Sequence, residues 1–91
     1  MKISFPPETP AYCEAGPALA FAAVVNDIRL ECSITAEALE DHFGAASIGK
    51  EDLQHAFDAH NHTIHVATRR LLTELGAMPV VLHSSYFRFA E

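Results

Sequence analysis

The longest regular pattern of hydrophobic and polar positions covers residues 50–75, a stretch without proline or glycine. At about 100° per residue, a helix over this stretch has one mainly apolar side and one mainly polar side. The apolar side carries Leu53, Phe57, His60, Ile64, Ala67, Leu71 and Leu75. The opposite side carries Glu51, His55, Asp58, His62, His65 and Arg69. The spacing predicts one long helix whose apolar side packs against the rest of the domain.

The most apolar stretch is residues 18–25, ALAFAAVV, which is typical of a strand covered on both faces. One face carries Leu19, Phe21 and Val25, and the other carries Ala18, Ala20, Ala22 and Val24. Residues 28–34 alternate between apolar and polar, as in a strand with one solvated face. Asn26 and Asp27, which lie between the two stretches, both tolerate positive φ, so we expect a two-residue β-hairpin turn.

The remaining elements are short. We expect a strand at residues 2–5, a proline-rich loop at 6–17, a short helix at 36–43 ended by Gly44, and strands at 78–82 and 86–89. The order is strand, hairpin, two helices, two strands (β-ββ-αα-ββ). It predicts an α+β fold: a mostly antiparallel sheet of about four to five strands, with the long helix packed across one face. The length fits a single domain, residues 1–91.

Charge and hydropathy exclude several classes of partner. Six Lys and Arg residues against twelve Asp and Glu residues give a formal net charge of −6, which disfavours a nucleic acid as partner. No apolar run approaches the roughly 20 residues of a membrane span, so we expect no membrane contact and a cytoplasmic location. Cys13 and Cys32 have no zinc-ligand spacing, and we expect free thiols, with Cys32 in the core.

Histidine is the unusual residue in the composition. Four of the six histidines, His55, His60, His62 and His65, fall within the long predicted helix. The pair Asp58 and His62 is spaced i, i+4, and His62 and His65 are spaced i, i+3, so their side chains share one face. One hypothesis is a divalent-metal site formed by His55, Asp58, His62 and His65. The other is a solvated polar face, because the chain has no HExxH motif and no cysteine ligand nearby.

His60 differs from the other three because it projects onto the apolar side, between Phe57 and Ile64. A single histidine in that position is typical of a hydrogen-bonded core residue, so we expect it to be buried. Ser84 and Ser85 follow His83, but adjacency in the sequence does not build a catalytic triad, and we interpret them as turn residues.

Several motifs together resemble a known family. They are residues 3–5 (ISF), 21–26 (FAAVVN), 29–34 (RLECSI), 38–39 (AL) with Phe43, and 52–57 (DLQHAF) with His60 and Ile64. Their order resembles a small bacterial family, the domain of unknown function number 1488. Its hairpin turn is often Asn-Gly or Asp-Gly, whereas Asp27 stands in the second position here. The resemblance implies a compact α+β fold, and it implies no activity and no catalytic residue.

Two functions remain open at this point. No dinucleotide, P-loop or nucleophile-elbow motif is present, and nothing indicates a cofactor. We therefore favour a non-enzymatic binding or regulatory module that contacts a protein partner, with a homodimer as one form of this hypothesis. The alternative is a small-ligand or metal-dependent activity on His55, Asp58, His62 and His65.

Overall fold

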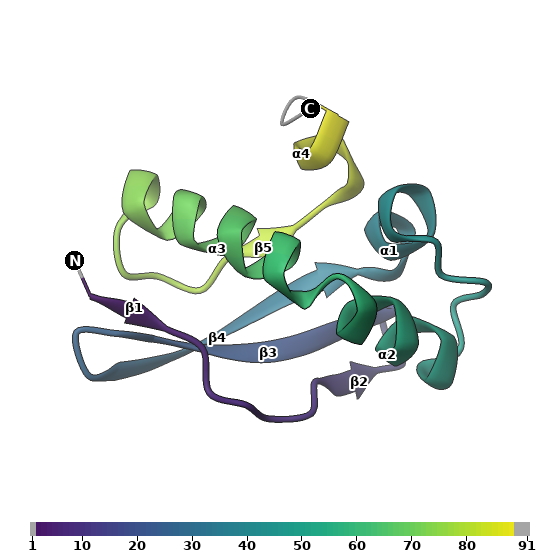
Figure 1. Ribbon diagram of the computed structural model, residues 1–91, viewed down its shortest axis with the longest axis horizontal. Coiled ribbons are helices and arrows are strands. Elements are labelled where there is room, and N and C mark those ends of the chain that lie inside the picture. The colour runs from purple at the N-terminus through teal and green to yellow at the C-terminus, as the bar shows by residue number, and fades with distance from the viewer. Residues whose placement is uncertain (1, 89–91) are drawn as a thin grey trace.

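The computed structural model describes residues 2–88 and contains one five-stranded sheet with its helices over one face (Figure 1). The strands are β1 (Ile3–Ser4), β2 (Ala11–Cys13), β3 (Ala18–Val25), β4 (Ile28–Thr35) and β5 (Val81–Leu82). β3 pairs antiparallel with β1 and β2 along one edge and with β4 along the other. β5 pairs parallel with β4. The α+β fold with a mostly antiparallel sheet is confirmed.

The helices are α1 (Ala36–Phe43), α2 (Lys50–Ala59), α3 (Asn61–Leu75) and α4 (Ser84–Arg88). The Thr35 hydroxyl caps α1 by accepting a hydrogen bond from the Ala38 N–H at 3.1 Å. Gly44 ends α1 in the left-handed conformation, with φ of 72°, as expected. None of the helices within residues 2–88 has both the length and the apolar character needed to cross a bilayer.

The hairpin between β3 and β4 turns where the sequence predicts. Val25 pairs with Ile28, and the two residues between them have positive φ, 51° for Asn26 and 69° for Asp27. Two consecutive positive φ values match the right-handed twist of the paired strands. Asn26 also accepts a hydrogen bond from the Lys2 N–H through Oδ1 at 3.0 Å, which ties the turn to β1.

Asp27→Gly is expected to raise the free energy of unfolding by about 0.5–1 kcal/mol, because glycine adopts positive φ without the Cβ penalty. Urea denaturation followed by circular dichroism measures the change. Gly44→Ala, which introduces a Cβ at a φ of 72°, serves as the opposite control and is expected to destabilise the domain. An unchanged or lower stability for Asp27→Gly would show that the turn carries no strain.

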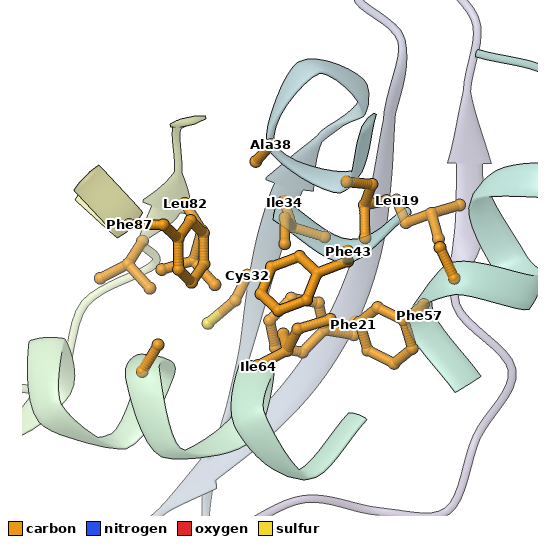
Figure 2. Close-up of a cluster of buried hydrophobic side chains, with 14 of the residues drawn as sticks. Leu19, Phe21, Cys32, Ile34, Ala38, Phe43, Phe57, Ile64, Leu82 and Phe87 are labelled. Carbon is orange, nitrogen blue, oxygen red and sulfur yellow. The ribbon is translucent and has the colours of Figure 1, made fainter. Parts of the chain in front are cut away.

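One hydrophobic core lies between the sheet and the helices. Leu19, Phe21 and Val25 point into it from β3, as predicted, and the ring centroids of Phe21 and Phe57 are 5.3 Å apart. Figure 2 shows aromatic and aliphatic side chains of strands and helices meeting around Cys32, which is buried as expected. Within residues 2–88, the opposite face of the sheet carries no helix (Figure 1).

The predicted single long helix is wrong in one respect, because it is broken at His60. His60 has φ of −126° and ψ of 22°, far from helical values, so α2 ends at Ala59 and α3 starts at Asn61. Ile64 and Ala67 of the predicted apolar side are buried in α3, as expected. Thr68 and Leu72 are buried in α3, whereas Leu75 of the predicted apolar side is exposed.

Three further expectations need correction. The predicted loop at 6–17 contains the strand β2, because Ala11–Cys13 pairs with the edge of β3. The predicted strand at 78–82 is paired only at Val81–Leu82. The strand predicted at 86–89 is instead the helix α4 as far as Arg88, and Phe89 lies outside the described residues. The aromatic β-propensity of that segment is overridden because Phe87 packs onto α1, 5.0 Å from the ring of Phe43.

Candidate functional site

The four residues of the metal hypothesis lie on two separate helices. His55 and Asp58 project from α2 and His62 from α3, and all three are exposed, while His65 is half-buried. Among residues 2–88, no group of three or more His, Cys, Asp or Glu side chains is arranged to hold a metal ion. The metal hypothesis therefore stays a prediction without geometric support, and metal analysis of protein purified without a histidine tag tests it.

His60 is more exposed, and His65 less exposed, than the predicted helix faces imply. His60 is exposed, with its ring centroid 5.3 Å from that of Phe43, so its predicted burial is wrong. His65 stacks on Phe5, with ring centroids 4.1 Å apart and an interplanar angle of 1°. His65 thus faces the residue that follows β1. Arg69, one turn further along α3, also lies over the Phe5 ring, at 5.8 Å.

Asp58 and His65 border the same cavity, of about 610 Å³. It lies between residues 5–9, the edge of β3 and the two helices α2 and α3. An ion pair closes its outer side, because the Arg29 guanidinium donates to both carboxylate oxygens of Glu8 at 2.5 and 2.8 Å. Both partners of this pair are largely solvent-exposed, so its contribution to stability is small.

The cavity exists because two separate strands share one edge of β3. β1 pairs with Val24 and Val25, and β2 pairs with residues 18–20. Within the described residues, this leaves residues 21–23 without a strand partner on that side. Pro6 and Pro7 follow β1 and have no N–H to donate, so the chain leaves the edge there and returns at β2.

Burial lowers the pKa of His65 below its ordinary value, with smaller contributions from His62 and Arg69. The cavity wall therefore favours the neutral form of this imidazole more than water does. Among the described residues, the cavity lining holds one hydroxyl group, that of Thr9, and no cysteine. The contact of His65 that the structure shows is its stack on Phe5, which makes it an aromatic part of the cavity wall.

The lowered pKa predicts a pH dependence of stability. The unfolded chain takes up the His65 proton at higher pH than the folded chain, so stability is fully present above the unfolded pKa of about 6.5 and decreases as the pH falls below it. His65→Phe keeps the stack on Phe5 and is expected to reduce the slope of unfolding free energy between about pH 6.5 and 5. His55→Gln, on the exposed face, is the control. Equal slopes for wild type and His65→Phe would contradict the prediction.

A serine, a histidine and an aspartate meet where α4 contacts α1. Ser84 Oγ donates to Asp41 Oδ2 at 2.6 Å and lies 3.2 Å from His42 Nε2, which is 3.0 Å from the Ser84 carbonyl oxygen. In a hydrolase the serine proton goes to the histidine, and the aspartate orients that histidine. Here the buried serine hydroxyl bonds the aspartate directly, so the cluster fastens α4 to α1. Ser84 was interpreted as a turn residue, whereas it begins α4 and binds that helix to α1.

An apolar groove of about 440 Å³, which the sequence did not predict, lies between the end of α3, β5 and α4. Three large apolar side chains at this groove are exposed: Leu75 by 58%, Met78 by 49% and Val81 by 50%. Leu71 and Tyr86 complete its walls. The available signal was the run from Leu75 to Leu82, which contains more apolar residues than a two-residue strand can bury.

We call this groove the β5 groove. The edge of the sheet that β5 forms runs beside it. Ser33 is aligned with Val81 in the parallel ladder, and its N–H donates to the Val80 carbonyl at 3.0 Å. In a parallel ladder, a residue that bonds across to the neighbouring strand is aligned with a residue whose own N–H and C=O point away from that ladder. The backbone groups of Val81 therefore point away from β4, and no strand pairs there within residues 2–88.

Fold and surface together define a small α+β domain with an apolar groove beside an open sheet edge. The chain belongs to the family described as "Protein of unknown function (DUF1488)", which matches residues 3–82 and confirms the resemblance drawn from the sequence motifs. No curated protein and no solved structure matches the chain significantly.

Proposed function

We propose that this protein is a non-enzymatic binding module that acts through contact with another protein. The supporting observation is the gathering of Leu75, Met78 and Val81, all about half exposed, around the β5 groove. Contiguous exposed apolar side chains of this kind mark interaction sites on folded proteins. The proposed location is the bacterial cytoplasm, and two free cysteines, one of them exposed, are in keeping with a reducing compartment.

The shape of the groove favours a different protein over a second copy of this chain. A twofold-symmetric contact needs a surface complementary to itself, whereas the β5 groove is concave. The net charge of −6 also opposes association of two identical chains. We therefore expect a monomer in sedimentation at micromolar concentration, and a dimer that Leu75→Asp dissociates would contradict the choice of partner.

Affinity capture with matched variants tests the proposal. Wild type, Leu75→Asp and Ile28→Asp are immobilised and exposed to bacterial lysate. Ile28 is 60% exposed at the hairpin, away from the groove, so Ile28→Asp introduces the same charge elsewhere. We expect a captured protein that is retained by Ile28→Asp and lost with Leu75→Asp. Identical capture by all three proteins would contradict a role for the groove.

A further inference from the structure

We infer that the β5 edge binds an extended segment of a partner protein in which apolar and basic residues alternate, so that the segment adds a strand beside Val81. This inference rests on the proposed function and specifies its partner. Strand addition combines main-chain hydrogen bonds to the edge with pockets for alternate side chains of the added strand. The β5 edge offers outward backbone groups at Val81 and a hollow on each side of it.

The backbone supplies the first part of the argument. The N–H and C=O of Val81 face away from β4, as the register with Ser33 requires. The edge is short and is entered through Pro79, which limits pairing to the residues around Val81. A visiting strand can therefore form one pair of main-chain hydrogen bonds with Val81, and most of its affinity must come from side chains.

Val81 separates two hollows, one on each side of the sheet edge. On the helix side lies the β5 groove. On the open face of the sheet lies a second hollow of about 680 Å³, which Val81 shares with Ser33, Thr35, Glu37 and Glu40. Successive side chains of an extended strand point to opposite faces. A strand placed beside Val81 thus directs alternate side chains towards the two hollows.

The linings of the two hollows differ in charge. Among the residues that the structure describes, the β5 groove is lined by no carboxylate and by no Lys or Arg side chain, so this side accepts apolar side chains. The second hollow carries the exposed carboxylates of Glu37 and Glu40, so that side favours Lys or Arg. Residues 77–87 of this chain (AMPVVLHSSYF) contain no Lys or Arg, so the β5 segment of a second copy lacks the required pattern.

Synthetic peptides test the pattern directly. The probe is an eight-residue peptide of alternating Val and Lys, and the composition control is a block peptide of four Val followed by four Lys. We expect the alternating peptide to bind about tenfold more tightly than the block peptide and than a Val–Glu peptide, by titration calorimetry. Hydrogen exchange read by NMR is expected to show slower exchange of the Val81 amide in the complex. Equal binding of the alternating and block peptides would overturn the inference.

Variants separate the inference from the proposed function. Val81→Pro removes the outward N–H and is expected to weaken binding of the alternating peptide about tenfold. Leu75→Asp is expected to weaken it as much, and Ile28→Asp to leave it unchanged. Peptide binding that depends on Leu75 but leaves the Val81 amide unprotected would overturn strand addition and keep the groove as the contact site. If lysate capture depends on Leu75 but no peptide binds, strand addition is likewise overturned and the proposed contact at the groove is kept.

Discussion

Phe43→Ala is expected to lower the free energy of unfolding by about 3–5 kcal/mol, because it opens a cavity where three helices meet. Phe43 is 7% exposed at the end of α1. Its ring contacts Phe87 of α4 edge-on, and the His60 ring covers it from the α2–α3 break. None of these elements can fill the space alone, so the surrounding structure relaxes only in part and the loss stays large.

Urea denaturation followed by circular dichroism measures the loss, with Ile28→Ala as control. Ile28 is 60% exposed, and its truncation is expected to change stability by no more than about 0.5 kcal/mol. Because a domain of this size has only roughly 5–15 kcal/mol of stability, the comparison is best made in the Asp27→Gly background. A loss below about 1 kcal/mol for Phe43→Ala would contradict its place at the junction of the helices.

Cys32 is expected to react with a thiol reagent at least about a thousandfold more slowly than Cys13 in the folded protein. Cys13 is exposed on β2, whereas Cys32 is 1% exposed on β4. Burial raises the pKa of the Cys32 thiol, and a backbone hydrogen bond with Val80 opposes this only in part. The reactive thiolate is therefore scarce, and the reagent reaches it only when the chain opens.

Labelling of Cys13→Ser with dithionitrobenzoate isolates Cys32, and Cys32→Ser isolates Cys13. In denaturing urea both variants are expected to react at the same rate, which is the control for intrinsic reactivity. Equal rates in the absence of urea would contradict the burial of Cys32. The rate at Cys32 in the absence of urea thus measures how often the core around β4 opens.

The features that the sequence predicted correctly are those determined by neighbouring residues. Asn26 and Asp27 identify the hairpin turn because few other residues tolerate positive φ. Gly44 marks the end of α1 for the same reason. The two faces of β3 follow from the strict alternation of side chains along a strand. Each of these depends on contacts no more than a few residues apart in the chain.

The features that were missed depend on residues far apart in the chain. The break at His60 has no proline or glycine signal, and it leaves His60 exposed and His65 half-buried. Ser84 fastens α4 to α1, but its partners Asp41 and His42 are more than forty positions away in the chain. The β5 groove could not be predicted for the same reason, since it forms only when α3, β5 and α4 meet.

The break at His60 also shortens the distance that residues 50–75 span. A continuous helix over residues 50–75 would be about 39 Å long. The longest dimension of the folded chain is 35 Å, and the other two are 27 and 23 Å. An unbroken helix would thus be longer than the folded chain is in any direction, and its last turn would project into water. By changing direction at a single residue, the chain fits both halves of that helix within its longest dimension.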